Sequence, residues 1–90
     1  MLIVSYDIAD DKLRTRFSRY LSKFGYRLQY SVFEIKNSQR ILENIICEVE
    51  ARYAKRFGEI DSVIIFDLSQ NCKKYCFGYA KHDEAVIMID

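Results

Sequence analysis

The sequence predicts an α+β fold, because two stretches with helical spacing alternate with stretches of β type in a chain of 90 residues. Residues 2–8 alternate between two faces, which is typical of a strand with one buried side. Residues 11–24 and 41–57 each carry apolar side chains on one helical stripe. Helices that connect strands must pack on a face of the sheet. We therefore expect one domain, residues 1–90, built as a ferredoxin-like sandwich with an antiparallel sheet and both helices on one face.

The first strand ends in a carboxylate. Val4, Tyr6 and Ile8 share its apolar face, and Asp7 lies at its carboxyl end on the other, less apolar face. A carboxylate is poorly placed there for a core, so Asp7 is a candidate site residue, with a hydrogen-bonded structural aspartate as the alternative. Asp10 or the residue after it should begin the first helix, because Asp side chains accept hydrogen bonds from the free N–H groups of a first turn.

The first predicted helix, residues 11–24, carries a stripe of cations beside its apolar stripe: Lys12, Arg16, Arg19 and Lys23. Arg14 lies on the other flank of the apolar stripe. Five cations without an acid among residues 12–24 fit a track for nucleic-acid phosphates, and a solvated helix face is the alternative. Gly25 is expected to end the helix as its C′ residue.

Residues 27–36 predict a single long strand with apolar side chains on both faces. Ser31, Phe33 and Ile35 share one of these faces, and we expect them to lie with Asp7 on the side of the sheet that the helices leave open. Half of the residues are hydrophobic and 14% are aromatic, a high share for a small domain. This surplus predicts an apolar surface for a second subunit, so we expect these three residues at the interface of a homodimer.

The second helix should begin at Asn37 or Ser38 and continue to about Phe57, before Gly58. Strands are predicted at residues 62–68 and from Cys72 to about Ala80, with a turn at residues 69–71. A short apolar strand, residues 85–89, ends the chain. Because a strand needs a partner for its N–H and C=O groups, we expect it to pair with an edge strand of the other subunit.

Composition and charge indicate where in the cell the protein is expected. The net charge is only +1, but residues 1–40 hold eight Lys and Arg against four Asp and Glu, so the N-terminal half is basic. No apolar run approaches the roughly 20 residues of a membrane span. The N-terminus lacks a signal-peptide pattern, and the three cysteines fit reduced thiols. We therefore expect a cytoplasmic protein without a membrane partner.

A set of short motifs over residues 1–36 resembles the second CRISPR-associated adaptation protein, the Cas-two family. The pattern comprises a Tyr-Asp-hydrophobic strand end, a helix with paired arginines and a glycine followed by a Gln-x-Ser-Val-Phe strand. It is carried here by Tyr6, Asp7, Ile8, Asp11, Arg14, Arg16, Gly25, Arg27, Gln29, Ser31, Val32, Phe33 and Glu34. Each piece is weak alone, whereas their order and spacing together are specific.

This resemblance implies a homodimer that binds double-stranded DNA and bridges copies of the CRISPR integrase, the Cas-one protein, during spacer acquisition. Some members of the family are metal-dependent nucleases of RNA or DNA, in which the strand-end aspartate holds magnesium. The resemblance thus assigns Asp7 as the catalytic and Mg²⁺-binding residue, if this member cleaves at all. With the basic stripe, it gives a nucleic-acid-binding set of Lys12, Arg14, Arg16, Arg19 and Arg27.

Other interpretations stay open. The arginines could instead form surface ion pairs with Asp10, Asp11 or Glu34, and Phe33 could pack in the core. One chain offers one carboxylate for Mg²⁺, which usually binds one or two, so a second Asp7 would have to come from a symmetry-related subunit. The chain could be a structural subunit, a magnesium-dependent endonuclease, or a toxin-type ribonuclease of the virulence-associated-protein-D kind, which shares the fold.

Overall fold

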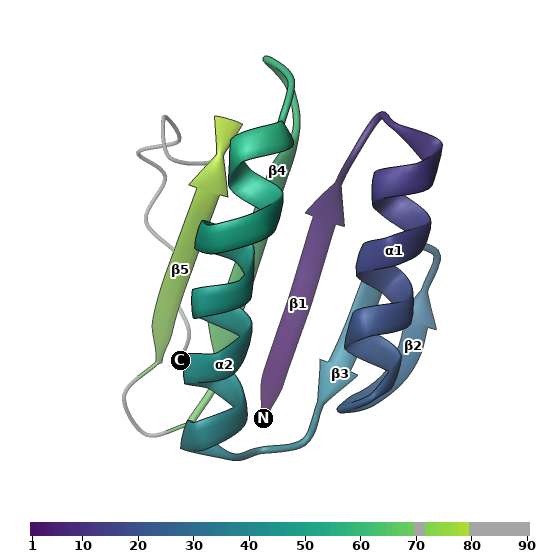
Figure 1. Cartoon of the computed structure of the whole chain (residues 1–90). Helices are drawn as coiled ribbons and strands as arrows, with labels where there is room; N and C mark the ends of the chain where they lie inside the picture. The colour runs from purple at the N-terminus through teal and green to yellow at the C-terminus, as the bar shows by residue number, and fades with distance from the viewer. Residues whose placement is uncertain (70–71, 80–90) are drawn as a thin grey trace.

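The computed structural model describes residues 1–69 and 72–79. A five-stranded sheet has the strand order β2-β3-β1-β4-β5, and every neighbouring pair is antiparallel. The elements are β1 (Leu2–Asp7), α1 (Asp11–Ser22), β2 (Gly25–Gln29), β3 (Val32–Ile35), α2 (Gln39–Glu48), β4 (Ser62–Asp67) and β5 (Lys73–Gly78). Both helices cover the same face of the sheet (Figure 1). The predicted α+β, ferredoxin-like fold is therefore confirmed.

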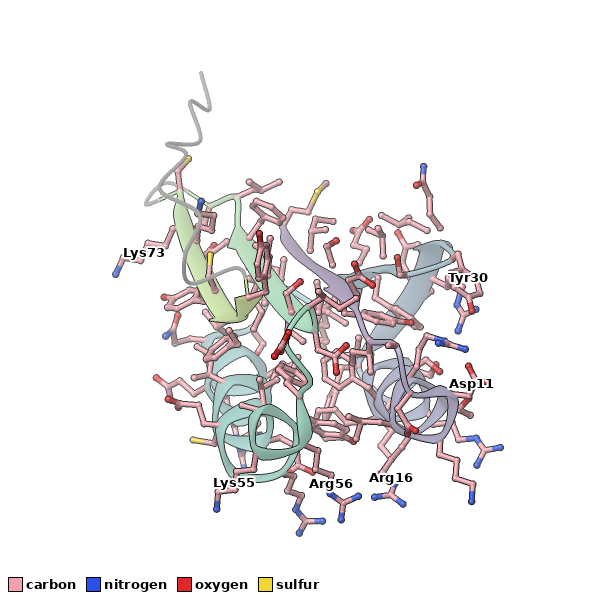
Figure 2. All side chains as sticks on the ribbon, turned by 90° about the horizontal axis from the view of Figure 1, so that it is seen from above. Asp11, Arg16, Tyr30, Lys55, Arg56 and Lys73 are labelled. Carbon is pink, nitrogen blue, oxygen red and sulfur yellow. The ribbon has the colours of Figure 1, made fainter. Side chains whose placement is uncertain are left out.

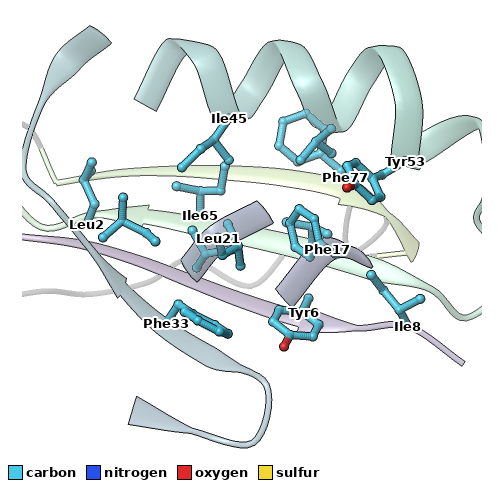
Figure 3. Packing of buried hydrophobic residues seen from close by; sticks show 14 of the residues in the cluster. Leu2, Tyr6, Ile8, Phe17, Leu21, Phe33, Ile45, Tyr53, Ile65 and Phe77 are labelled. Carbon is cyan, nitrogen blue, oxygen red and sulfur yellow. The ribbon is translucent and has the colours of Figure 1, made fainter. Parts of the chain in front are cut away.

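The core lies between this face and the helices (Figure 3). Alternate residues of β1 point into it, so Val4 and Tyr6 are buried while Asp7 is exposed. The ring of Tyr6 meets that of Phe17 edge to face, with centroids 5.2 Å apart, and Phe17 meets Tyr53 at 4.8 Å. This aromatic chain joins the sheet, α1 and the end of the second helix, and such pairs add about 0.5–1.5 kcal/mol each beyond area burial.

The prediction of a single strand over residues 27–36 is wrong. The segment is part of a hairpin, β2 and β3, which turns at Tyr30 and Ser31. The register shifts between Arg27 and Gln29, which marks a bulge just before the turn. The turn contains no Gly, Pro, Asn or Asp, and Ser31, a weaker turn residue, is its only local sequence signal. The Ser31 carbonyl accepts a hydrogen bond from the Tyr6 N–H at 3.1 Å, which ties the turn to β1.

The expected open-face position of Phe33 and Ile35 is also wrong. Phe33 pairs with Val4 and Ile35 with Leu2, and both side chains are buried in the core, with exposed fractions of 1% and 2%. The hairpin turn set the register of β3 independently of β2, and a shift of one residue moves every side chain to the opposite face. Ser31 is half-buried in the turn. None of the three is therefore an exposed apolar contact on the helix-free face.

The second helix begins as expected at Ser38, whose hydroxyl accepts from the Ile41 N–H. Beyond Glu48 it continues as a π-helical segment, η1 (Val49–Tyr53), and a 3₁₀ turn, η2 (Ala54–Arg56). The predicted helix end near residue 57 is confirmed.

Two glycines have close-packing roles. A Cβ on Gly25 would lie 1.9 Å from the Glu34 carbonyl oxygen, so this glycine allows β2 to approach β3 and is not the C′ residue of α1, which ends at Ser22. Gly78 has φ 72°, and a Cβ there would lie 2.2 Å from the Asp61 carbonyl oxygen.

The expected strand at residues 85–89 lies outside the described residues. Among those described, no helix is long and apolar enough to cross a membrane.

Candidate nucleic-acid interface and strand-end carboxylate

A basic groove runs along the outer side of the helix layer. It is open, with a volume of ≈ 1090 Å³, and lies between α1 and the η1–η2 end of the second helix. Figure 2 shows Arg16, Lys55 and Arg56 on this side, pointing away from the sheet. Seven cations line the groove: Lys12, Arg16 and Arg19 from α1, Lys23 from its C-cap, and Arg52, Lys55 and Arg56 from η1 and η2. We call this set the basic groove.

The two cation rows arise from different local patterns. In α1, cations at spacings of four, three and four residues form one stripe beside the buried side chains Leu13, Phe17 and Leu21. In η1 and η2, Val49 and Tyr53 face the core, which leaves the basic side chains of this segment outside. Since α1 and the second helix cover the same face of the sheet, the two stripes meet across the groove.

The positive charge of the basic groove is only weakly compensated. Two carboxylates line it, Asp11 and Glu48. Asp11 pairs with Arg14, outside the groove, and Glu48 lies 3.5 Å from Arg52. Within residues 1–69 and 72–79, no ion pair involves the other six cations of the groove. Like charges held together repel one another, and a polyanion in the groove would relieve this repulsion.

Tyr53 lines the groove, and the pKa of its hydroxyl depends on the charges around it. Burial raises the pKa of this phenol, and the Glu48 carboxylate raises it further, whereas Arg16, Arg52 and Arg56 lower it. Cations from both walls thus act on the same hydroxyl. This agrees with the geometry, in which both rows line the same groove.

Arg14 has a different position from the other predicted cations. Its guanidinium donates to the carbonyl oxygens of Ile8 at 3.0 Å and Ala9 at 3.3 Å, pairs with Asp11 and lies 5.9 Å from the centre of the Tyr30 ring. The hydrogen bond that the guanidinium donates to the Asp11 carboxylate is the main reason that the pKa of Arg14 is raised. These contacts hold the loop between β1 and α1, so the ion-pair alternative describes Arg14 in this structure.

Arg27 is also apart from the basic groove. It lies on β2, at the edge of the sheet, with its guanidinium carbon 5.2 Å from the centre of the Phe33 ring. The structure therefore brings together Lys12, Arg16 and Arg19 of the predicted set, and it separates Arg14 and Arg27 from them. The η1–η2 row, Arg52, Lys55 and Arg56, was missed. A signal was present, since three cations within five residues follow the second apolar stripe.

Asp7 is the last residue of β1 and is exposed on the helix-free face, as expected from the alternation. In the described part of the chain its carboxylate forms no hydrogen bond or ion pair. Ser62 lies opposite it on β4. The neighbouring carboxylate, Asp61, is buried and uses both oxygens to accept backbone N–H groups.

This donor set fits Mg²⁺ only partly. No group of three or more His, Cys, Asp or Glu side chains suited to a metal occurs among the described residues. A single free carboxylate agrees with the habit of Mg²⁺ to bind one or two carboxylates, several waters and substrate phosphates. If Mg²⁺ bound here, one chain would offer it the single carboxylate of Asp7, and a second carboxylate would have to come from another subunit.

Comparisons with known proteins agree with the residues that carry the resemblance. The family described as "CRISPR associated protein Cas2" matches residues 1–75. The chain is 35% identical over 74 residues to "CRISPR-associated endoribonuclease Cas2 2" of Methanospirillum hungatei, covering 80% of this chain and 76% of the relative.

Other relatives bear related names. The chain is 39% identical over 75 residues to "CRISPR-associated endoribonuclease Cas2 1" of Archaeoglobus fulgidus, covering 78% of this chain and 72% of that protein. A shorter match, 43% identical over 42 residues, is to "CRISPR-associated endonuclease Cas2 2" of Thermus thermophilus and covers 47% of each chain. No solved structure matches significantly.

Proposed function

Since the chain belongs to the CRISPR-associated protein Cas2 family, we propose that it serves spacer acquisition as a homodimer that binds duplex DNA and bridges copies of the integrase, the Cas-one protein. The observation that carries this proposal is the basic groove. The groove is lined by seven cations and only two carboxylates, and it lies on the outer side of the helix layer. Binding of this kind depends on phosphates and not on base sequence.

The dimensions of the groove suit one phosphate backbone. Lys12 and Lys23 are eleven residues apart, which is about 16 Å along a helix. That length covers the rise of about five nucleotides in one strand of a duplex. The second row, on η1 and η2, faces the same backbone from the other wall. A duplex would thus lie across the helix layer, with one strand along the groove.

The position of Asp7 favours a structural role over a cleaving one. The basic groove and Asp7 lie on opposite sides of the sheet, so phosphates held in the groove do not meet the carboxylate of the same chain. Binding and any cleavage are then separate properties. The apolar side chains on the helix-free face, Ile3, Val32, Ile64 and Phe66, support the proposal that this face meets a second copy of the chain.

A magnesium-dependent nuclease is the second candidate, because Asp7 is exposed and without a partner in the described residues and the relatives are named endoribonuclease or endonuclease. When bound, Mg²⁺ would polarise a phosphodiester and activate water. Asp7 would hold the ion, with RNA or DNA as substrate. The family match gives no support to the toxin-type alternative.

The proposal is tested by duplex affinity as a function of salt. Wild-type protein should lose affinity steeply as salt rises, by about 0.9 in the logarithmic slope for each phosphate neutralised. The double variant Arg16→Glu, Arg56→Glu should weaken binding by about a hundredfold or more at low salt. Lys36→Glu, Arg40→Glu is the matched control, because it changes the net charge equally and both residues are exposed outside the groove.

Equal losses in both variants, or an affinity that does not depend on salt, would contradict the groove as the DNA site. The bridging role has its own test, which is co-purification with the Cas-one protein followed by an integration assay. A groove variant that binds the integrase but no longer integrates DNA would agree with the proposal.

A further inference from the structure

Two buried carboxylates lie at the two ends of β4, and they differ in what they hold. Asp67, at the far end, accepts from the Ser69 N–H, two residues along the same segment. Asp61, just before β4, accepts from one donor 52 residues away in the sequence and from another only three residues before it. Its Oδ1 accepts from the Ala9 N–H at 2.9 Å, and its Oδ2 accepts from the Gly58 N–H at 2.8 Å.

These two N–H groups belong to the ends of the two walls of the basic groove. Ala9 lies two residues before α1, whose first turn carries Lys12. Gly58 lies two residues after Arg56, the last residue of η2. A smaller hollow of ≈ 320 Å³, lined by Asp10, Lys12, Leu13, Arg16 and Arg56, marks where the walls meet.

We propose that Asp61 is a positioning residue, which fixes the α1 and η2 walls of the basic groove to one another so that Arg16 and Arg56 engage the same phosphate backbone. This inference rests on the proposed function of the groove. Asp61 does not touch the nucleic acid; it acts through the two loops that it joins.

Burial makes this link stiff. The residue is only 4% exposed, and a carboxylate out of water is costly unless its oxygens accept hydrogen bonds. Loosening either loop would leave a buried oxygen without its donor. The end of β5 closes the site, because the Tyr79 N–H donates to the Asp61 carbonyl at 2.8 Å and Gly78 packs against that carbonyl. Arg14 holds the opposite side of the first loop through the carbonyls of Ile8 and Ala9.

The test is a double-mutant cycle on duplex affinity at fixed salt, with the full chain. Asp61→Asn keeps one acceptor and turns the other into a donor that faces an N–H. We expect it to weaken binding by about five- to tenfold. Arg56→Ala should cost about fivefold in the wild-type background and less than about twofold in the Asp61→Asn background, because a displaced Arg56 has little left to lose.

Asp67→Asn is the matched control, since it also removes a buried carboxylate of β4 that accepts a backbone N–H. It should leave affinity, and the cost of Arg56→Ala, unchanged within about twofold. Amide hydrogen exchange of Ala9 and Gly58 should accelerate in Asp61→Asn and not in Asp67→Asn. If Asp61→Asn does not fold, Asp61→Ser, whose hydroxyl still accepts one N–H, replaces it in the cycle.

Additive effects of Asp61→Asn and Arg56→Ala would overturn the positioning role while leaving the groove as the DNA site. Unchanged exchange at both amides would overturn the link itself. A wild-type protein that binds no duplex would remove the proposed function, and with it the role of Asp61 in binding. These three failures are therefore distinguishable.

Discussion

The two faces of this sheet present opposite chemistries. The helix layer carries the basic groove, whose cations come from α1 and the η1–η2 segment and, among the described residues, are mostly without an ion pair. The helix-free face carries partly exposed apolar side chains and the carboxylate of Asp7, which has no hydrogen bond or ion pair to any other described residue. A cationic surface suits phosphates, whereas an apolar surface suits another protein chain. Under the proposed function, nucleic-acid binding belongs to one side of the sheet and self-association to the other, so substitutions on either side should remove one property and leave the other.

The largest expected effect is the loss of cleavage, without loss of DNA binding, when Asp7 is replaced. We expect Asp7→Ala, and Asp7→Asn as its isosteric partner, to lower any magnesium-dependent cleavage by about a thousandfold. Duplex affinity should stay within about twofold, because the carboxylate lies away from the groove. Removal of Mg²⁺ with a chelator should reproduce the loss of cleavage in the wild type. The measurements are a cleavage assay on labelled RNA and DNA and a parallel binding titration.

A folded Asp7→Ala protein that binds DNA and the integrase normally, yet does not support integration, would reverse the scaffold interpretation. It would place the carboxylate in the physiological reaction.

The next effect concerns the apolar face. Phe66→Glu should raise the dissociation constant of the homodimer by at least about a hundredfold, because it introduces a charge into an apolar interface. Light scattering over a range of concentrations would report the change. Ile60→Glu is the control, since Ile60 is exposed (63%) but lies in the loop before β4 and not on the sheet. A wild-type protein that is monomeric at micromolar concentration would contradict the dimer.

A smaller effect separates the two kinds of cation on α1. Lys12→Ala should lower the slope of log affinity against log salt by about 0.9 and leave the thermal unfolding midpoint unchanged. Arg14→Ala should leave this slope unchanged and lower the thermal unfolding midpoint, because its guanidinium donates hydrogen bonds to the carbonyls of Ile8 and Ala9. Salt titrations and thermal melts of both variants provide the comparison. An equal loss of slope in both would mean that Arg14 also contacts phosphate.

The smallest effect is a change in titration. Because Arg56 lowers the pKa of Tyr53 and burial raises it, Arg56→Ala should raise this pKa further. NMR of labelled tyrosine would detect the shift. Tyr6 is the internal control, since its pKa, also raised mainly by burial, depends on Arg27 and Arg14 and not on the groove.

The raised pKa of Tyr53 also sets a direction for stability. The folded protein retains the phenol proton where the unfolded chain loses it, near pH 10. The free energy of unfolding should therefore fall as the pH rises above about 10, through the folded pKa, and should not depend on this group at lower pH.

Local patterns in the sequence determined several features of this protein. The alternation in residues 2–8 gave the strand and placed Asp7 at its exposed end. The Asp10 and Ser38 caps, whose side chains accept hydrogen bonds from the first turns, marked the helix starts. The stripe of α1 gave one wall of the basic groove. Each of these depends on residues within a few positions of one another, which is the range over which spacing carries information.

Tertiary structure decided the rest. The turn at Tyr30 and Ser31 has no strong turn residue, and it moved Phe33 and Ile35 from an expected interface into the core. Arg52, Lys55 and Arg56 became part of a site only because the second helix packs beside α1. Asp61 accepts hydrogen bonds from Ala9, 52 residues before it, and from Gly58, three residues before it, and so joins the two loops. Periodicity reports which side of an element is buried, whereas packing alone determines which elements then face each other.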